Sequence, residues 1–563
     1  MTAGLTAVGL GLVGVMVGCV TAAGAGPPVS TGEIGFDHPG GYCREAFSLV
    51  LSASATNAAI YYTTNGVEPS PGHAERYLHP LAIHSTTIVL AAAFDEQANG
   101  VGTGARTFLF AEDILKQTGG HFPKTWGMDG GRPVLADYAM ATVTEADAVT
   151  RSKVVAGLQS LAIVCIIADP ASLFSADYGI YAHPLERGNT WERGVAVELY
   201  EANREPAFHY ACGLRIHGGT SREPKESPKH SFRLSFKQRY GLDQLRFPVF
   251  GPGGARTFDS LILRAGNNDS WLAGTGESPR PATYLRDEWM RRSMLEMRHP
   301  SARGRFVQLY LNGLYWGLYD LCERPGPDLL AGEADGSVEH DVRKGSKMED
   351  GDNTAWNHMM ALANAGVGED RTYEEICQRL DVNEFADYMI LNFYAGNSDW
   401  DRAANWYAIR PRTDSGRFQF LAWDGECTLG GLEADTLALD DDDSPQRLFH
   451  KLAENAAFRK LFATRAQLLL FNDGALAPEK SRARFQKLVE AVAPAMVAEA
   501  ARWGNYRRVQ PVNHPAAATG DRVVQEWRPE VNRILYDYFP NRRERVLNQF
   551  RERGLYGDAD QRQ

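Results

Sequence analysis

The segment NSDWDRAANWY (397–407), followed by FQFLAWDGE (418–426), decides how the larger part of this 563-residue chain is interpreted. Each stretch places an acidic residue beside aromatic residues, Asp399 in the first and Asp424 in the second. Asn405 lies six residues after Asp399, and Asp424 lies nineteen residues after Asn405, where a predicted strand ends. A carboxylate that can accept a proton, with an amide and a second carboxylate that can bind a divalent cation, suits phosphoryl transfer.

The sequence before this segment alternates strands with one strong helix. Two predicted strands, ACGLRIHG (211–218) and HSFRLSF (230–236), flank a polar loop, and a third, FDSLILRA (258–265), leads to the helical run 282–297. Two more strands meet at Asn312-Gly313, a strong signal for a β-hairpin. After these strands the chain is mostly helical. The order predicts an α+β domain whose outline is that of a protein kinase.

Four separated motifs strengthen this interpretation. They are HGGTSREPKESPKHSFRLSF (217–236), LYLNGLYWGLYDLCERP (309–325), GNSDWDRAANWYAIRP (396–411) and FLAWDGECTLG (420–430), with YFPNRRERVLNQFRERGL (538–555) closing the match. In this order they closely resemble the CotH kinases, an atypical branch of the protein-kinase-like fold named after spore coat protein H. The resemblance implies a two-lobed kinase-like domain over residues 151–555.

The resemblance also implies roles for individual residues. Asp399 becomes the catalytic carboxylate, Asp424 a metal ligand and Asn405 the second metal ligand, with ATP and Mg²⁺ or Mn²⁺ as cofactors. For the ATP phosphates it implies Lys344, for which a solvated lysine is the alternative, and a loop with a basic strand, whose residues are Gly218, Gly219, Ser221, Arg222 and Lys229. The loop lacks the usual kinase pattern G-x-G-x-x-G, although its backbone N–H groups can still surround a phosphate.

The N-terminal third contains a second folded unit. Short alternating segments separated by turn signals predict a small all-β immunoglobulin-like sandwich over residues 33–112. The stretch YYTTNGVEP (61–69) resembles the module found at the C-terminal end of chitobiase and β-hexosaminidase enzymes. Such a module can bind glycan or act as a spacer. Residues 113–150 are interpreted as a linker to the kinase-like domain.

Charge and the first residues suggest where the protein acts. The net charge of −11 argues against a nucleic-acid partner, because such binders need a basic surface. Residues 1–25 contain an uncharged apolar run and small residues that fit a cleaved signal peptide or, with acylation at Cys19, a lipoprotein signal. We therefore expect an extracytoplasmic protein, secreted or attached to the cell envelope, with membrane contact only through this signal or lipid anchor.

Several further residues have simpler interpretations as structural or solvent-exposed residues. Asp401 and Glu426 are more simply residues that cap backbone amides, and the acidic run Asp440–Asp443 is most simply a solvated loop. Glu323 ends a hairpin strand near the expected adenine site and is interpreted as structural. Asn267 to Ser270 is typical of the N-cap region before a helix. The scattered cysteines predict no disulfide framework or zinc site, and Cys165 is interpreted as a small buried hydrophobic residue.

Together these features favour an exported atypical protein kinase. It would transfer the γ-phosphoryl group of ATP to Ser or Thr of a secreted or surface protein. The alternative from another class is a catalytically silent kinase-like surface scaffold or carbohydrate-associated binding protein, which would not bind nucleotide. A third hypothesis treats Asp399, Asp424 and their acidic neighbours as carboxylates of a sugar-cleaving hydrolase, for which paired carboxylates alone are weak support.

Overall fold

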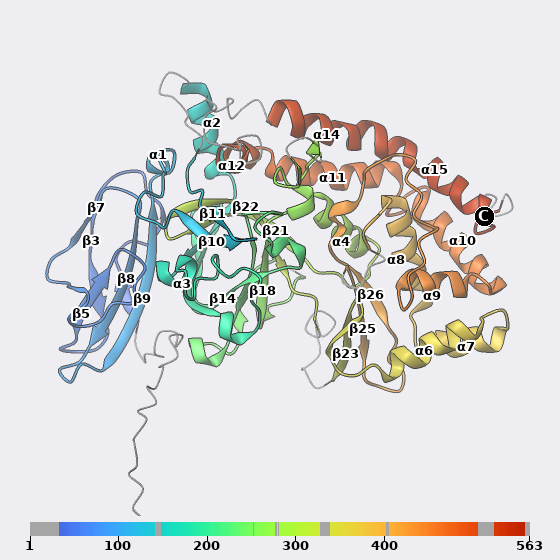
Figure 1. Ribbon diagram of the computed structural model, residues 1–563, viewed down its shortest axis with the longest axis horizontal. Coiled ribbons are helices and arrows are strands. Elements are labelled where there is room, and N and C mark those ends of the chain that lie inside the picture. Colours follow the sequence, from blue (N-terminus) through green and yellow to red (C-terminus); the bar gives the residue numbers. More distant parts are fainter. Residues whose placement is uncertain are drawn as a thin grey trace, which may run out of the picture.

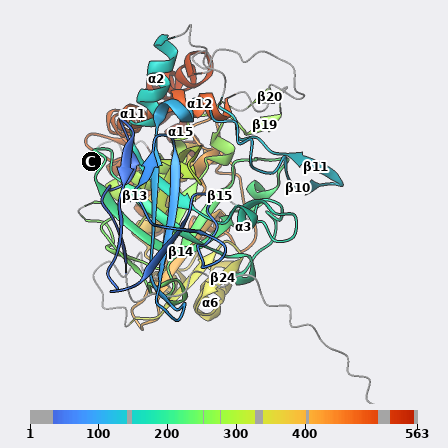
Figure 2. The ribbon, with the colours of Figure 1, turned by 90° about the vertical axis from the view of Figure 1, so that its left-hand side faces the viewer.

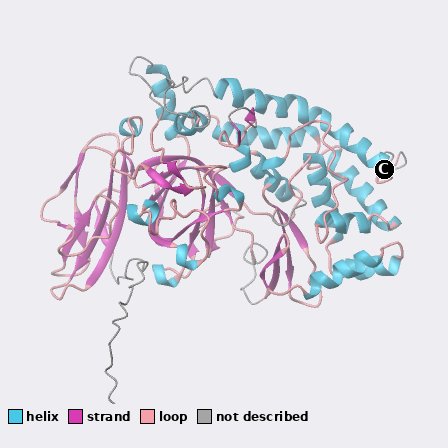
Figure 3. Cartoon of the chain, in the orientation of Figure 1, coloured by secondary structure: helices cyan, strands magenta, loops and turns pink. Residues whose placement is uncertain are grey.

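The protein is built from three parts that follow one another along its longest axis (Figure 1). A β-sandwich comes first, a β-barrel second, and a mostly helical part with a small sheet third. Figure 3 shows most of the strands in the first two parts and most of the helices in the third. This computed structural model describes residues 33–140, 148–251, 253–275, 278–279, 281–326, 338–400, 405–504 and 523–557.

The sandwich is made of short strands, as the alternating sequence predicts. Its main sheet has the order β2-β9-β8-β5-β6, while β3 pairs with β7 and β1 with β4. Val89 and Ala91, two positions apart in β8, point into a core that also holds Leu49 and Phe108. The strands are β1 (Ile34–Phe36), β2 (Gly41–Tyr42), β3 (Phe47–Leu49), β4 (Leu51–Ala53), β5 (Ala59–Thr63), β6 (Glu75–Arg76), β7 (Leu81–Ile83), β8 (Thr87–Phe94) and β9 (Gly100–Leu109).

The barrel closes through the order β12-β13-β14-β15-β18-β22-β21, in which only β12 and β21 run parallel. Strand β12 is buried along its whole length, and Cys165 within it is 1% exposed, which confirms the predicted buried strand. Asn312 and Gly313 have φ angles of 48° and 79°, the left-handed conformations that a two-residue hairpin turn requires. The strands are β12 (Ala162–Ile167), β13 (Arg193–Tyr200), β14 (Pro206–His217), β15 (Ser231–Ser235), β18 (Ser260–Arg264), β21 (Gly304–Leu311) and β22 (Leu314–Glu323).

One helix, α4 (Arg286–Glu296), connects β18 to β21, so the predicted order of strands around a single helix is confirmed. The third part contains the sheet β24-β23-β25-β26 and most of the helices, whereas α12 packs on β22 of the barrel. Among the described residues, no helix has the length and apolar content needed to span a membrane. The elements are β23 (His340–Lys344), β24 (Lys347–Asp350), β25 (Trp406–Pro411), β26 (Gln419–Ala422), α6 (Thr354–Ala365), α7 (Asp370–Cys377), α8 (Val382–Ala395), α9 (Pro445–Leu452), α10 (Ala456–Leu470), α11 (Pro478–Val492), α12 (Ala495–Trp503), α14 (Arg528–Arg533) and α15 (Phe539–Glu552).

The segment interpreted as a linker, 113–150, is instead folded onto the barrel over residues 113–140. It forms the hairpin β10 (Thr125–Asp129) and β11 (Arg132–Leu135). Trp126 is 2% exposed, and its ring centroid lies 5.7 Å from that of Trp316 on β22. Its indole N–H donates to the hydroxyl of Tyr138 at 2.8 Å. The aromatic residues of this segment are therefore part of the barrel core, which composition alone did not reveal.

A buried carboxylate joins the sandwich to the barrel. Glu198 on β13 is 1% exposed and accepts hydrogen bonds from Thr107 of β9 at 2.5 Å and from Tyr200 at 2.6 Å. Viewed from the sandwich side, the sandwich strands lie in front of β13 and β14 (Figure 2). Burial raises the pKa of Glu198 to about 7, while the two hydroxyl hydrogen bonds oppose the rise. The contact between the two parts is therefore sensitive to pH.

We expect Glu198 to make the protein less stable as the pH rises. The pKa is 4.5 in the unfolded chain and about 7 in the folded protein, so the folded protein holds the proton more tightly. Its contribution is complete below pH 4.5 and is lost as the pH rises to about 7. Relative to Glu198→Gln, which does not ionise, the wild type should lose roughly 3 kcal/mol of unfolding free energy over this range. Urea unfolding of both proteins at several pH values measures this, and a difference that does not change with pH would contradict it.

Candidate active site

Asp399 lies on the turn that follows helix α8. The helix ends at Gly396, whose φ of 59° and ψ of 42° give the left-handed C-cap typical of glycine. Asn397 is buried and donates from its side chain to Asn392 Oδ1 at 2.9 Å, while its own Oδ1 accepts from the Asp399 N–H at 3.3 Å. Trp400 is completely buried directly after Asp399. The acidic side chain is therefore held between an asparagine turn and an aromatic anchor.

Asp424 lies on a second turn, directly beyond β26. Its φ of 58° and ψ of 37° are left-handed, and its side chain is 30% exposed. The next residue, Gly425, donates its N–H to Asp287 Oδ1 on α4 at 2.9 Å. A Cβ at position 425 would lie 2.8 Å from Met290 Cγ, so only glycine allows this close approach to the helix. The sequence Asp-Gly-Glu thus brings two carboxylates to the surface of α4.

The two turns lie side by side. The N–H of Ser398 donates to the Cys427 carbonyl at 3.3 Å, and the Cys427 thiol lies 3.9 Å from Asp399 Oδ2. Asn405 donates from its side-chain amide to the carbonyl of Asp399. Trp406 at the start of β25 pairs with Ala422 at the end of β26. Asn405, directly before Trp406, therefore lies beside the segment that runs from β26 to Asp424. The structure therefore brings together the three residues that the sequence singled out, Asp399, Asn405 and Asp424.

Arg264 connects the second turn to the barrel. Its Nη2 donates to Asp424 Oδ1 at 2.8 Å and to Glu426 Oε1 at 2.6 Å, and its Nε lies 3.3 Å from Asp287 Oδ2. The guanidinium also lies 4.6 Å from the ring centroid of Trp423. Burial raises the pKa of Glu426 to about 7, with Arg264 opposing the rise. Glu426 therefore faces a charged partner and is more than the simple backbone cap we expected.

Sequence reasoning missed the role of Arg264. In protein kinases a lysine of the third strand pairs with a glutamate of the following helix. Here β18, which precedes α4 in the chain, ends in Arg264, and Asp287 lies in the first turn of α4. The position of the arginine at the end of FDSLILRA, the predicted strand that leads to the strong helix, was the signal that could have found it.

Basic side chains face the second turn from β23 and from the end of β14. Lys344 is half-buried, and the resulting desolvation lowers its pKa, while the charge of Asp424 opposes this shift. Its Nζ lies 5.4 Å from the ring centroid of Tyr407. His217 is half-buried, and its pKa is well below the usual value because of desolvation and because Lys344, Arg264 and other cations surround it. This concentration of positive charge beside the carboxylates suits an anionic ligand such as a phosphate chain.

The loop after His217 has the predicted glycines but not all of the predicted contacts. Gly218 has a φ of 122°, and a Cβ there would lie 2.2 Å from Ser221 Oγ, so this position requires glycine. Gly219 has no atoms near an added Cβ and lies open. Ser221 and Gly219 both belong to the short turn that leads to Arg222. The first half of the loop can therefore approach a ligand with its backbone.

The contacts of Arg222 differ from those of its predicted phosphate-binding role. It is 7% exposed, and its guanidinium donates only to backbone carbonyls, of Gly218 at 2.9 Å, Pro184 at 2.9 Å and Glu186 at 2.8 Å, and to that of Ile216. Burial lowers its pKa to about 10. The arginine fixes the shape of the loop from inside, and no donor is directed to a phosphate. The prediction of direct phosphate binding by Arg222 is thus replaced by a structural role.

The side chain of Lys229 is also buried inside the protein. It is 1% exposed, and its Nζ donates to Glu499 Oε1 of α12 and to the Leu318 carbonyl, both at 2.7 Å. It also lies 4.7 Å from the ring centroid of Tyr319. Glu499 is fully buried and accepts from the N–H of Leu318 at 2.7 Å. The predicted phosphate-binding lysine therefore forms a buried ion pair between the barrel and α12.

We expect Lys229→Met to destabilise the fold by about 3–5 kcal/mol, because it leaves the Glu499 carboxylate buried without a cation. The double variant Lys229→Met/Glu499→Gln should recover most of this loss, since a neutral amide can still accept from Leu318. Urea unfolding compares the three proteins. A stable Lys229→Met protein that has lost only nucleotide binding would support the original phosphate-binding assignment and contradict the structural one.

The other residues that the sequence singled out lie in structural contacts or outside the described part of the chain. Glu323 is 3% exposed and accepts from the Arg303 N–H at 2.7 Å, in agreement with a structural role. The N-cap interpretation of Asn267 to Ser270 is wrong, because 267–269 forms a separate short turn and α4 begins at Arg286 after Leu285. Asp269 nevertheless accepts from the N–H groups of Leu285 at 2.9 Å and Arg286 at 3.1 Å. In the acidic run, Asp443 pairs with Arg343, while Asp440 pairs with Arg447 at 2.6 Å. Asp401 lies outside the described residues.

The donor atoms at the second turn suit a hard divalent cation. Carboxylate oxygens of Asp424 and Glu426 and the amide oxygen of Asn405 are the ligand types that Mg²⁺ and Mn²⁺ prefer. Within the described ranges, no group of three or more His, Cys, Asp or Glu residues forms a metal site by itself. An Mg²⁺ site that uses one or two carboxylates is usually completed by substrate phosphates, so a small donor set fits a metal that arrives with a nucleotide.

Two family models match the chain in the order that its parts have. The model of the chitobiase/β-hexosaminidase C-terminal domain matches residues 38–103, and the sandwich is similar to that domain. The model of the CotH kinase protein matches residues 214–546, which is more than half of the chain and includes Asp399, Asn405 and Asp424. No curated protein matches the chain. By the extent of the second match and the order of its motifs, the chain belongs to the CotH kinase protein family.

Proposed function

We propose that this protein is an atypical protein kinase that transfers the γ-phosphoryl group of ATP to Ser or Thr of another protein. The observation that carries the proposal is the contact between the two turns, which brings Asp399 next to the segment with Asp424 and Glu426. A proton acceptor beside a pair of metal-binding oxygens, with cations around them, is the arrangement that phosphoryl transfer requires. Membership of the family supports the same conclusion.

Each residue has a role in this proposal. Asp399 orients the acceptor hydroxyl and takes its proton, while Asp424, Asn405 and Glu426 hold Mg²⁺ or Mn²⁺ together with ATP. When bound there, ATP would supply the phosphoryl group, and the metal ion would neutralise part of its charge. Lys344 and Arg264 add positive charge beside the carboxylates. Arg264 also keeps Asp424 and Glu426 close together when no cation is bound, because one guanidinium bonds to both.

We also propose that the protein acts outside the cytoplasm on a secreted or surface protein. The support is the uncharged apolar run within residues 1–25, which contains a lipid site at Cys19 and ends in small residues that fit signal cleavage. These residues lie outside the described part of the chain. N-terminal sequencing and mass measurement of the exported protein would test the proposal, because cleavage or acylation changes both.

A second candidate function, glycan binding, is favoured by a cavity of about 780 Å³ between the sandwich and the barrel. Its walls include small side chains such as Ala92 and Ala196, and it is also lined by Tyr210, Glu68 and Asp169. Tyrosine rings and carboxylates can contact the faces and hydroxyl groups of sugars, and the volume is that of a small-molecule site. Calorimetric titration with short chitin-type oligosaccharides tests this, and absence of heat at millimolar ligand would contradict it.

Transfer of labelled phosphate from ATP by the purified protein tests the kinase proposal. We expect incorporation into the protein itself or into a generic Ser/Thr substrate, with Mg²⁺ or Mn²⁺ and not after chelation of the metal. Absence of both transfer and ATP binding would overturn the proposal in favour of the silent scaffold. Release of reducing sugar that survives chelation would instead favour the hydrolase.

A further inference from the structure

The C-terminal segment contacts the turn that carries Asp424. Arg533, at the end of α14, donates from Nη2 to the Leu429 carbonyl at 2.6 Å and from Nη1 to the Gly430 carbonyl at 2.7 Å. Glu530 fixes this guanidinium through both carboxylate oxygens, at 2.7 and 2.8 Å. Residues more than 100 positions later in the chain thus hold the end of the Asp424 turn.

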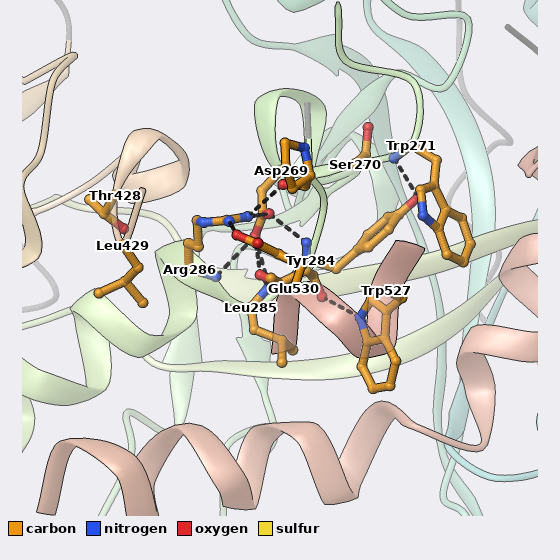
Figure 4. A network of polar contacts seen from close by, with 12 residues as sticks. Asp269, Ser270, Trp271, Tyr284, Leu285, Arg286, Thr428, Leu429, Trp527 and Glu530 are labelled. Carbon is orange, nitrogen blue, oxygen red and sulfur yellow. Dashed lines mark hydrogen bonds and ion pairs between the residues drawn. The ribbon is translucent and has the colours of Figure 1, made fainter. Parts of the chain in front are cut away.

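The same glutamate reaches the start of helix α4. Figure 4 shows Arg286 between Asp269 and Glu530, with ion pairs to both. The residue after Arg286 is Asp287, which accepts the N–H of Gly425 at 2.9 Å. The contacts therefore form a closed ring. It runs from the start of α4 to Gly425, along the turn to Leu429, and back through Arg533 and Glu530 to the helix.

A second arginine of the segment holds the other turn. Arg542 on α15 is fully buried and donates to the carbonyls of Tyr394 at 2.8 Å and Phe393 at 2.7 Å, in the last turn of α8 before Asp399. It also donates to the carbonyls of Leu432 and Ala434, both at 2.7 Å, beyond the Asp424 turn. One guanidinium thus links the two chain segments that carry Asp399 and Asp424.

The Asp424 turn needs such support because its backbone is not in a relaxed conformation. Asp424 and Leu429 have φ angles of 58° and 52°, which residues with a Cβ adopt at a cost. Conformations of this kind persist only where surrounding contacts fix them. The ring through Gly425, Leu429, Glu530 and Arg533 supplies contacts at both ends of the turn.

We propose that Glu530, Arg533 and Arg542 are positioning residues, which set the distance and orientation between the Asp399 turn and the Asp424 turn for cation and nucleotide binding. This inference rests on the proposed kinase function for its kinetic consequences, and on the contacts alone for its effect on the turns. It also gives the closing part of the sequence, which lies far from the carboxylates in the chain, a place in the site.

The experiment compares Arg533→Gln with Arg543→Gln in the complete protein. Arg543 is the matched control, because its side chain is 32% exposed, that of Arg533 is 31% exposed, and Arg543 contacts Glu544 and Phe471 away from both turns. In Arg533→Gln we expect the Mn²⁺ concentration for half-maximal transfer to rise about 10- to 100-fold. Hydrogen exchange at the amides of Gly425 and Leu429 should become faster, and Arg543→Gln should resemble the wild type in both measurements. Arg533→Lys, which can still reach one carbonyl, should recover part of the loss.

Wild-type metal dependence together with wild-type exchange in Arg533→Gln would overturn the inference. Failure of the wild type to bind ATP or transfer phosphate would overturn the proposed function instead, and exchange at Gly425 and Leu429 would still decide whether Arg533 positions the turn. A general loss of stability is recognised by thermal unfolding of the same variants. It would lower the melting temperature without changing the Mn²⁺ requirement of the protein that remains folded.

Discussion

Asp399→Asn should lower the rate of phosphate transfer about 10²- to 10⁴-fold while leaving the fold and ATP binding intact. Asparagine has nearly the same shape as aspartate and can keep the turn, but it cannot accept the proton of the attacking hydroxyl. The turn itself is held by Asn397 and by the buried Trp400, neither of which changes. Single-turnover transfer from labelled ATP gives the rate of the chemical step, and nucleotide titration gives the affinity separately.

The matched control for this prediction is Asp414→Asn, an exposed aspartate in the loop between β25 and β26. It should behave as the wild type. If Asp399→Asn retained the wild-type rate, another residue would have to take the proton.

Asp424→Asn should have the largest effect at the metal site, with loss of transfer by at least about 10³-fold. A cation that bridges phosphate oxygens contributes several kcal/mol of charge stabilisation, and each 1.4 kcal/mol corresponds to about tenfold in rate. Asparagine is the right substitution because it tolerates the left-handed backbone of position 424, whereas alanine would add strain to the loss of charge. Its amide oxygen can still accept from Arg264 in place of Oδ1.

Electron paramagnetic resonance can measure the binding of Mn²⁺ in the presence of ATP. This measurement distinguishes a loss of metal binding from a general loss of folding or nucleotide binding. Asp424→Asn should bind the ion weakly even where ATP alone still binds. Asp473→Asn provides a control. The side chain of Asp473 is 99% exposed, and the residue lies far along the sequence from the turns that carry Asp399 and Asp424. Normal Mn²⁺ binding by Asp424→Asn would mean that the ion is held elsewhere.

Local features of the fold could be predicted well from the sequence. The buried run 161–167, the Asn312-Gly313 hairpin and the helix before β21 each depend on neighbouring residues, so periodicity and turn chemistry were sufficient. The spacing of Asp399, Asn405 and Asp424 was also informative, because β25 and β26 pair as neighbours and return the chain to the same place.

The errors came from partners that are distant in the sequence. Lys229 was assigned to phosphate because it lies on a basic strand, but its partner Glu499 is 270 residues away. Arg222 was assigned from its place in a Gly-rich loop, yet its donors reach carbonyls such as that of Pro184. Whether a basic side chain faces solvent, a ligand or a buried partner depends on such distant packing. The guanidinium of Arg264 contacts three carboxylates from distant parts of the chain, so the sequence signal at the end of its strand did not reveal these partners.

The folded segment before the barrel has a consequence for how the chain reaches its native state during synthesis. Trp126 packs on Trp316, and Arg502 donates to the carbonyl of Asp137 at 2.6 Å, across 365 positions of sequence. The sandwich can form as soon as it leaves the ribosome, but residues 113–140 must wait until α12 has been made. Until Trp316 and α12 have been made, Trp126 has only nearby partners such as Tyr138 and Tyr181, so the nascent chain carries exposed apolar surface that invites chaperones or misassembly.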